Sequence, residues 1–488
     1  MKLLDLVVIG LYFLAMLAIG WYYSRRTETA DDYLLGGRRM SPFLIGLSLF
    51  ATLTSTLSYL AYPGEIVKYG PMMMAQITAF PAVMVVVGWW LIPAIMRQHD
   101  FTSGYELLEA RLGLSGRLLG ASMFVVLRTI WMASILYATS DKVLVPMLGL
   151  DRGWTPGLCA ALGLITMIYT TEGGMRAVVI TDAAQSLIMF AGAIVTILVV
   201  TASLGGLDQW WPSEWAPHWD PPVFWFRSGV RVTFLGSFLN MFVWLTCTAG
   251  SDQMAIQRYL STRDAAAARR SFAVQLVTQV LMIILLAMVG FAVLAYFTAR
   301  PDEFGPSVSL LASADELLPR FIIQVMPAGL SGLVIAAILS AAMSSLSSGM
   351  NSSSAVITTD FINRFSRATP TPHAQVRLAK MISVVIATLA IGLSMVIGHL
   401  AENLMELCFK VVNLLTAPLF VLFFLALFVP RATPLAGILA ALASIGVAVS
   451  ISFFKAFGLE FLWTAPCALA AGITVGMLAS YLPLGKRD

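Results

Sequence analysis

The sequence predicts an all-α integral membrane protein with about thirteen transmembrane helices. Of its 488 residues 59% are hydrophobic and 11% are charged, whereas a soluble globular domain carries about 25% charged residues. The mean hydropathy is +0.84. Apolar windows of about 20 residues, the length that crosses a bilayer, recur along the chain. Such helices leave only short loops, so we expect a single transmembrane domain over residues 1–488.

The apolar windows also set the order of the predicted helices. The first window has one basic residue before it and lacks a small-residue cleavage site, so it is interpreted as a retained span and not as a signal peptide. The thirteen predicted spans are residues 5–23, 42–67, 73–96, 118–146, 155–171, 178–204, 231–250, 271–297, 330–358, 379–400, 403–428, 433–453 and 460–482.

The composition argues against several classes of protein. The formal charge of +4 is small and dispersed, which does not suit a nucleic-acid partner. The pattern shows no catalytic cluster, so we do not expect an enzyme. Neither a disulfide framework nor a zinc site is indicated, because the cysteines lie inside apolar segments without metal-binding spacing. These cysteines are Cys159, Cys247, Cys408 and Cys467.

Basic residues predict the orientation of the chain. Alternate loops carry them, and such loops face the cytoplasm. The loop at 205–229 is instead rich in tryptophan, which suits the outer interface. We therefore expect the N-terminus outside and the C-terminus in the cytoplasm. The basic residues are Arg25, Arg26, Arg38 and Arg39, then Arg258, Arg263, Arg269 and Arg270, then Arg364, Arg367, Arg377 and Lys380, and finally Lys486 and Arg487.

The predicted helices also permit an inverted repeat. Helices two to six and helices seven to eleven form two groups of five, and the second group starts on the opposite side of the membrane from the first. Many secondary transporters have this arrangement.

Serine residues recur along one face of the ninth predicted span. A helical face brings together Ser340, Ser344, Ser347, Ser348 and Ser352, with Ser345 beside them. Neutral hydroxyls and carbonyls can bind a hard cation such as sodium without burying a large net charge. The alternative is close helix packing, in which small residues let two membrane helices approach and the Ser hydroxyls bond to neighbouring helices.

A polar cluster interrupts the second predicted span between Thr52 and Ser58. Serine and threonine side chains compete for backbone hydrogen bonds, and irregular backbone is tolerated within a membrane where it lines a cavity or binds an ion. The cluster predicts a local helix break. The alternative is a continuous helix whose hydroxyls bond back to their own turn.

Three ionisable residues are expected inside spans, where a lone charge is costly. Asp182 is a candidate functional residue, with capping of a late-starting helix as the alternative. Lys410 has Glu406 one turn before it, which favours an internal ion pair. Arg128 has no such neighbour and could bind a solute carboxylate, or else form a pair or extend to the interface.

Three segments together resemble the solute:sodium symporter family. They are residues 173–185, which contain Gly173, Gly174 and the Thr181-Asp182 pair, residues 252–260, and residues 341–348. Residues 417–432 also resemble the family's eleventh span and following loop. The resemblance implies a LeuT-like core of five plus five helices over about 42–428, with peripheral helices at about 5–23, 433–453 and 460–482. It also implies alternating access around a central site.

The resemblance further implies the ion and solute sites, and a carrier that functions as a monomer in the cell membrane. The main sodium site would use Ala51, Thr54, Ala341, Ser344 and Ser345. A second sodium site would use Asp182, Ser344, Ser347 and Ser348. Solute contacts are expected at Ser55, Thr56 and Ser58, and at Gln76, Arg128, Trp131, Asn240 and Trp244.

The expected function is sodium-coupled symport of a small organic solute into the cell, with a carboxylate-bearing solute or a sugar as candidates. The alternative is a membrane solute sensor that keeps the transporter fold without net transport.

Overall fold

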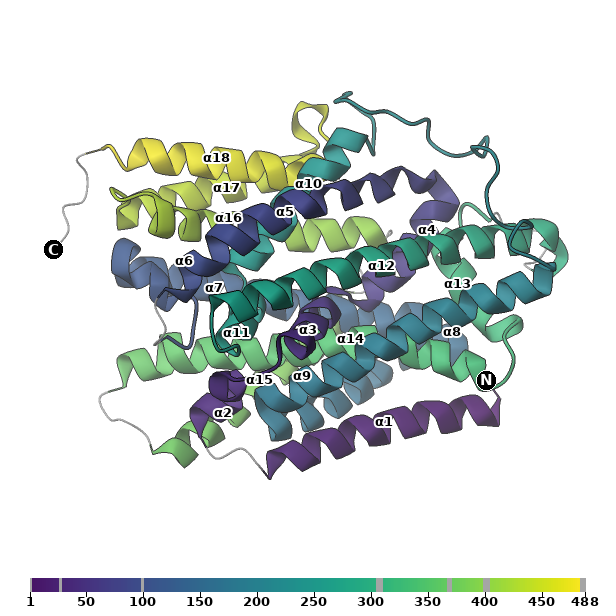
Figure 1. The fold of residues 1–488 in the computed structure, drawn as a ribbon, viewed down its shortest axis with the longest axis horizontal. Coiled ribbons are helices and arrows are strands. Elements are labelled where there is room, and N and C mark those ends of the chain that lie inside the picture. The colour runs from purple at the N-terminus through teal and green to yellow at the C-terminus, as the bar shows by residue number, and fades with distance from the viewer. Residues whose placement is uncertain are drawn as a thin grey trace.

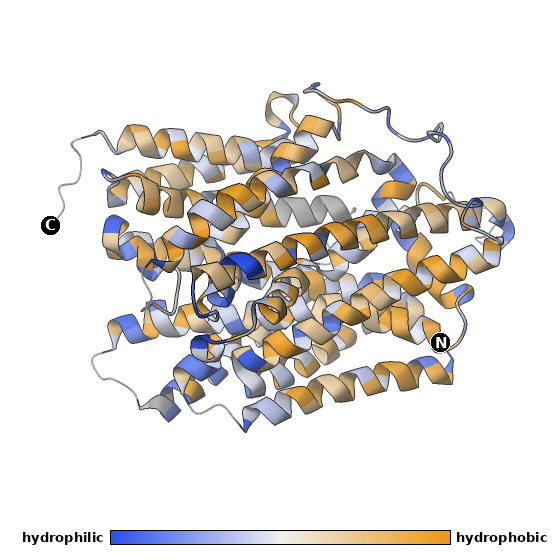
Figure 2. Ribbon diagram, in the orientation of Figure 1, coloured by the Kyte–Doolittle hydropathy of each residue, from blue (hydrophilic) through white to orange (hydrophobic). Residues whose placement is uncertain are grey.

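The computed structural model describes residues 2–25, 29–97, 101–303, 310–366, 371–397 and 404–482, without the side chains of 303, 372, 404–411 and 413. Its regular structure over these ranges is entirely helical (Figure 1), which confirms the predicted all-α class. Hydrophobic residues cover the helices through the middle of the molecule, and hydrophilic residues gather towards both ends (Figure 2).

The first half of the chain runs from the peripheral helix α1 to the long helix α9. Its elements are α1 (Leu3–Ser24), α2 (Ala30–Leu35), η1 (Gly36–Arg38), α3 (Pro42–Leu53), α4 (Thr56–Tyr69), η2 (Pro71–Ala79), α5 (Phe80–Val86), η3 (Val87–Leu91), α6 (Ile92–Met96), α7 (Glu106–Thr139), η4 (Ser140–Leu144), α8 (Val145–Leu148), η5 (Arg152–Trp154) and α9 (Thr155–Leu204).

The second half begins with another interrupted helix and ends with two helices that pack on each other. Its elements are α10 (Phe234–Ser251), α11 (Gln253–Leu260), α12 (Ala265–Ala299), η6 (Pro301–Glu303), α13 (Ala314–Gln324), α14 (Leu330–Val356), η7 (Ile357–Asn363), α15 (Pro372–Ile397), α16 (Leu404–Phe428), α17 (Pro434–Phe454), η8 (Ala456–Gly458), η9 (Phe461–Trp463) and α18 (Thr464–Ala479).

Ten helices in the described ranges are long and apolar enough to cross a membrane, or eleven if α3 and α4 form one broken span. The number thirteen therefore stays a prediction. Helix α9 bears on that number, because its 50 residues would extend about 75 Å as a straight helix, against a hydrocarbon core of about 30 Å. It turns at Gly174, where φ is 60° and ψ is −162°. This turn lies between the predicted spans 155–171 and 178–204.

Glycine is required at the turn of α9 for two reasons. A positive φ disfavours any residue that carries a Cβ. A Cβ on Gly174 would also lie 2.8 Å from the Tyr33 ring and 2.9 Å from the Tyr33 carbonyl oxygen. The two arms of α9 are thus held at this point against α2.

Two helices are interrupted at corresponding positions of the two halves. Helices α3 and α4 meet at an angle of 66° around Thr54 and Ser55, which confirms the predicted break in the second span. Helices α10 and α11 are separated by Asp252, whose extended backbone caps α11. The prediction of a loop after residue 250 is wrong, because Gln253–Leu260 form a helix. Paired interruptions support the inverted repeat, because discontinuous helices mark the ion and solute sites of such transporters.

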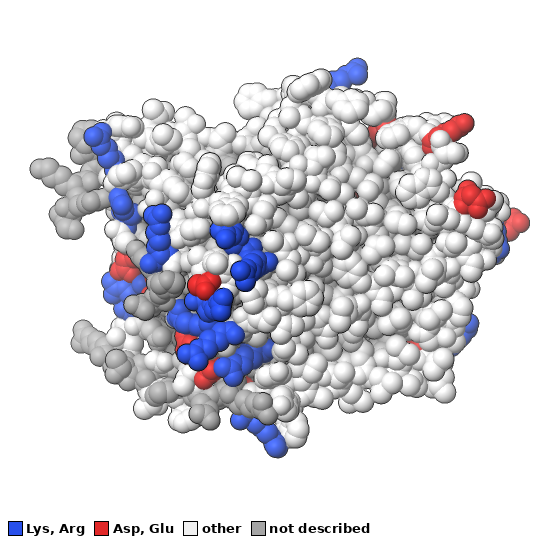
Figure 3. Space-filling model, viewed as in Figure 1, with Lys and Arg blue, Asp and Glu red and all other residues white. Residues whose placement is uncertain are grey.

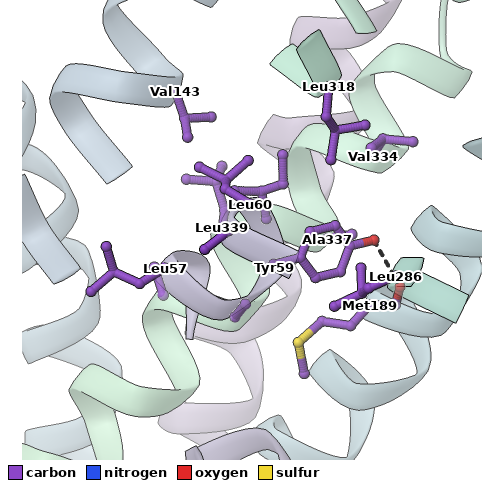
Figure 4. Packing of buried hydrophobic residues seen from close by; sticks show 14 of the residues in the cluster. Leu57, Tyr59, Leu60, Val143, Met189, Leu286, Leu318, Val334, Ala337 and Leu339 are labelled. Carbon is purple, nitrogen blue, oxygen red and sulfur yellow. Dashed lines mark hydrogen bonds between the residues drawn. The ribbon is translucent and has the colours of Figure 1, made fainter. Parts of the chain in front are cut away.

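The broken helix packs deep inside the molecule. Leu57, Tyr59 and Leu60 of α4 lie in one hydrophobic cluster with Ala337 and Leu339 of α14 (Figure 4). The Tyr59 hydroxyl donates a hydrogen bond of 3.1 Å to the carbonyl oxygen of Met189 on α9. Helices α4, α9 and α14 therefore pack together next to the end of α3.

Candidate functional site

The C-terminal end of α3 faces the serine-rich part of α14. Because α3 stops at Leu53, its last carbonyls lack partners within the helix. The Ser344 hydroxyl donates to the carbonyl oxygen of Ala51 at 2.8 Å. The Ser345 hydroxyl donates to the carbonyl oxygen of Thr52 at 3.0 Å. Two helices far apart in sequence are thus joined through oxygen atoms.

The predicted main sodium residues fall largely within this contact. Ser344 also lies 3.3 Å from the carbonyl oxygen of Ala341, so Ala51, Ala341 and Ser344 meet directly. Ser345 touches the neighbouring carbonyl of Thr52. The Thr54 side chain is directed to α12, where it lies 3.4 Å from Gln279 Oε1.

The serine face of α14 is buried along its whole length. The Ser347 hydroxyl donates to the carbonyl of Ser344 at 3.0 Å. The Ser348 hydroxyl lies 2.8 Å from the Thr52 hydroxyl and donates to Asp182 Oδ2 at 3.4 Å. Hydroxyls that bond to neighbouring helices are also what the helix-packing alternative predicts, so a sodium site on this face stays a prediction.

Asp182 is fully buried in the second arm of α9 and meets a cation, as an intramembrane acid should. The Arg258 Nη2 atom lies 2.9 Å from Asp182 Oδ2 and 2.5 Å from the Ser348 hydroxyl. The Ser48 hydroxyl donates to the same carboxylate oxygen at 2.5 Å and accepts from Arg258 Nε at 2.8 Å. The capping alternative is wrong, because Asp182 lies within the helix.

The location of Arg258 corrects the sequence prediction. We counted it among the basic residues of a cytoplasmic loop, but it lies in α11 and is completely buried. Counting basic residues near span ends cannot separate a solvated arginine from one paired inside the protein. The unpaired carboxylate of Asp182 was the signal that a cation had to be present nearby.

Arg128 also has a charged partner that is distant in sequence. Its guanidinium Nη2 atom binds the carboxylate of Asp252, the residue between α10 and α11, and both side chains are buried. The pairing alternative for Arg128 is therefore confirmed. Its Nε atom has no hydrogen-bond partner within the described ranges. Helix α11 is thus held by one ion pair at each end, to α7 through Asp252 and to α9 through Arg258.

The other predicted solute residues surround the break in α3 and α4 and continue onto α10. Ser55 caps α4, and the Thr56 hydroxyl donates to the carbonyl oxygen of Ile338 at 3.0 Å. Gln76 donates to the Tyr62 hydroxyl at 2.9 Å. The amide oxygens of Gln76 and Asn240 are buried without hydrogen-bond partners within the described ranges.

The remaining solute candidates are dispersed. Ser58 donates its backbone N–H to the Ser55 hydroxyl at 3.4 Å. Trp131 is buried in the cluster that contains α4, whereas Trp244 packs against the other large cluster. The two tryptophans therefore belong to different hydrophobic clusters.

Several sequence predictions fall outside what the structure describes. The side chains of Glu406, Cys408 and Lys410 lie outside the described residues, so their pairing stays a prediction. Cys159, Cys247 and Cys467 are free thiols. Among the described residues there is no group of three or more His, Cys, Asp and Glu side chains that could hold a metal ion.

The donor set suits a monovalent hard cation. Carbonyl and hydroxyl oxygens from α3 and α14 are neutral, and Asp182 adds one buried carboxylate. The carbonyl end of a half-helix and an unwound segment are the groups that coordinate sodium in discontinuous-helix transporters. The residues present therefore fit sodium.

Comparison with known proteins agrees with this geometry. The model of the sodium:solute symporter family matches residues 33–444. The sodium/sialic acid symporter SiaT of Proteus mirabilis is 29% identical over 90% of this chain and 86% of its own. The sodium/sialic acid symporter NanT of Aliivibrio fischeri is 27% identical over 99% and 94%. Human sodium-coupled monocarboxylate transporter 1 is 28% identical over 92% and 72%.

Solved structures share the architecture. A substrate-bound, outward-open Na⁺-coupled sialic acid symporter superposes with a TM-score of 0.88 at 26% identity, covering 98% of both chains. MhsT in complex with L-phenylalanine shares the fold, with a TM-score of 0.51 at 13% identity over 91% of this chain and 99% of its own. These likenesses confirm the LeuT-like fold and sodium as the coupling ion. The chain belongs to the sodium:solute symporter family and is a sodium-coupled symporter of a small organic solute.

Proposed function

We propose that this symporter imports a carboxylate-bearing solute, with an acidic sugar as the leading candidate, together with two sodium ions. The observation that carries the proposal is the buried guanidinium of Arg128 with a free Nε–H, next to a helix break. Arginine recognises carboxylates through paired, charge-assisted hydrogen bonds. Relatives named for sialic acid and for monocarboxylates support the same class of solute.

The solute would bind beside the break in α3 and α4. Its carboxylate would be held by Arg128, and Ser55, Thr56 and Ser58 would bind its other polar groups, with Gln76 and Asn240 offering unpaired amide oxygens to solute hydroxyls. Trp131 and Trp244 would supply apolar walls. Arg128 would then exchange Asp252 for the solute, which links solute binding to the position of α11.

The first sodium ion would be held by the carbonyls of Ala51, Thr54 and Ala341 and the hydroxyls of Ser344 and Ser345. The second would be held by Asp182, Ser344, Ser347 and Ser348. Because these groups belong to α3, α9 and α14, bound sodium would tie the broken helix to the rest of the site. Such an ion shifts the conformational equilibrium through its differential affinity for the states.

The sodium gradient is sufficient for concentrative uptake. An ion that crosses 100 mV inward releases about 2.3 kcal/mol, and a tenfold gradient adds about 1.4 kcal/mol. One ion therefore supports accumulation of several hundredfold, and two ions roughly the square of that. A solute sensor without net transport would show no such accumulation.

We propose that the N-terminus is outside, the C-terminus is cytoplasmic and the monomer is the functional unit. Lys and Arg side chains gather, with some Asp and Glu among them, at the end of the molecule where α18 finishes, whereas few Lys and Arg side chains are in view at the opposite end, where α1 begins (Figure 3). Positive charge marks the cytoplasmic side. The exposed tryptophans Trp211, Trp215 and Trp225 lie in the segment assigned to the outside.

Uptake by the purified protein in liposomes tests the proposal. An inward sodium gradient should drive accumulation of radiolabelled sialic acid or lactate, and a neutral hexose should be taken up far less. Arg128→Gln should abolish the preference for the acid. Arg111→Gln is a suitable control, because Arg111 is exposed and contacts a carbonyl of Pro430. Equal uptake of acids and neutral sugars by the wild-type protein would refute the carboxylate assignment.

A further inference from the structure

Gln185 has the features of an ion ligand, although neither the serine face nor the Asp182 motif assigns it a role. It lies three residues after Asp182 on α9, so both side chains share one helical face. Both residues are completely buried. Asp182 Oδ1 and Gln185 Oε1 each lack a hydrogen-bond partner among the described residues. Because buried polar atoms are nearly always paired, two unpaired oxygens one turn apart require an explanation.

The packing of α9 against α14 places Gln185 at the level of Ser344. Asp182 contacts Ser348, and a Cβ on Gly192 would lie 2.5 Å from Ala337 Cβ. These contacts set an antiparallel register, so residues 182–192 of α9 run alongside residues 348–337 of α14. Gln185 therefore lies at the level of Ser344 along the two helices, which is the level of the predicted sodium sites.

The orientation of the Gln185 amide is fixed by the peripheral helix α1. Gln185 Nε2 donates to the Tyr12 hydroxyl at 2.9 Å, and that hydroxyl lies 3.3 Å from Met343 Sδ on α14. The Tyr169 hydroxyl donates to the Met343 carbonyl at 3.1 Å, which holds the first arm of α9 in the same place. Since the NH₂ group is engaged with Tyr12, the amide oxygen is the end of Gln185 that stays free.

The guanidinium of Arg258 leaves the Oδ1 atom of Asp182 without a hydrogen bond among the described residues. Arg258, Ser48 and Ser348 all bond to Oδ2. A cation near Asp182 can therefore use Oδ1 without displacing Arg258. One carboxylate oxygen thus compensates the arginine, and the other remains for an ion.

We propose that Gln185 is a ligand of the second sodium ion through Oε1, alongside Asp182 Oδ1 and the oxygens of Ser344 and Ser347, and that Tyr12 is its positioning residue. This inference rests on the second sodium site of the proposed function. It gives the peripheral helix α1 a part in ion binding, since the hydroxyl of Tyr12 holds the amide in place.

Equilibrium binding of radioactive sodium to the purified protein tests this assignment independently of transport. Gln185→Met keeps the length of the side chain but removes the amide oxygen. We expect two ions per wild-type protein and one per Gln185→Met protein. Tyr12→Phe should retain two ions but weaken one of them several-fold. Gln275→Met is the matched control, because Gln275 on α12 is another buried glutamine with an amide atom that is unpaired among the described residues. The Gln275→Met protein should bind two ions.

Asp182→Asn separates failure of this assignment from failure of the second site. If Asp182→Asn binds one ion while Gln185→Met binds two with wild-type affinities, the second site stands and the role of Gln185 is overturned. If the wild-type protein and Asp182→Asn each bind one ion, the second site itself is absent and the inference falls with it. Thermal unfolding in potassium medium identifies a variant that has lost its fold. If Gln185→Met is lost in this way, the sodium affinity of Tyr12→Phe is the test: one ion bound several-fold more weakly supports the role of Gln185, and two ions bound with wild-type affinities overturn it.

Discussion

At the scale of single residues, the buried ion pair between Asp182 and Arg258 should determine stability as well as ion binding. Removing one partner leaves an uncompensated charge inside the protein, which costs about 3–5 kcal/mol. We expect Arg258→Met to lower the unfolding temperature of the detergent-purified protein strongly in potassium medium. Arg263→Met is the control, because Arg263 pairs with Asp264 at the surface, where such pairs contribute about 0–1 kcal/mol. Equal effects of the two substitutions would contradict the pairing.

The residues around Asp182 differ in how far the sequence could predict them. Asp182 stands out in an apolar segment, so its need for a cation follows from the cost of a buried charge. Its partner could not be found from the sequence, since Asp182 and Arg258 meet because α9 and α11 both pack against α3 and α14. The sequence does not single out Gln185, for a different reason. Burying an uncharged amide inside a span costs less free energy than burying a charge, so it predicts no particular partner.

At the scale of elements, helix α13 covers the outer arm of the broken helix. A Cβ on Gly64 of α4 would lie 2.3 Å from Asp315 Oδ1, so the two helices touch at this point. Helix α13 is not among the candidate membrane spans. Burial raises the pKa of Asp315 to about 6, against the effect of Lys68, while Glu65 raises the pKa further.

The raised pKa of Asp315 makes the free energy of unfolding depend on pH. The folded protein binds the Asp315 proton more tightly than the unfolded chain does, so this contribution is fully present below about pH 4. It is lost as the pH rises through about 6. Asp315→Asn should flatten this part of the stability profile and stabilise the protein at pH 7 and above. Unfolding temperatures between pH 4 and 8 check this, with Asp208→Asn, at an exposed carboxylate far from α13 in the sequence, as the control that keeps the wild-type slope.

The two helix breaks show what local sequence can predict at this scale. The Ser and Thr cluster predicts the break between α3 and α4, because its side chains compete with the backbone for hydrogen bonds. The break before α11 follows a sparser set of hydroxyl residues, Thr246, Thr248 and Ser251. It is produced by Asp252, which caps α11 with its side chain and binds Arg128 of α7, so its cause lies in a tertiary contact.

At the scale of the whole molecule, hydropathy predicts the membrane class and most helix positions, since the hydropathy of each segment indicates whether it lies in hydrocarbon or in water. It does not give the number of crossings where a glycine turn divides one long helix, as at Gly174. It also does not give the register between helices, on which every ion ligand depends. The serine face of α14 is visible in the sequence, whereas its contacts with Ala51 and Thr52 depend on the fold.

The central claim is that sodium joins the end of α3 to α14 through Ser344. Sodium titrations of unfolding temperature, at constant ionic strength with potassium as the balancing ion, test it most directly, because a ligand stabilises the state that binds it. Ser344→Ala should raise the sodium concentration for half-maximal stabilisation about tenfold, which corresponds to about 1.4 kcal/mol. Ser354→Ala, on the same helix but bonded to Ala379 of α15, should leave it unchanged. A wild-type sodium response in Ser344→Ala would contradict the account.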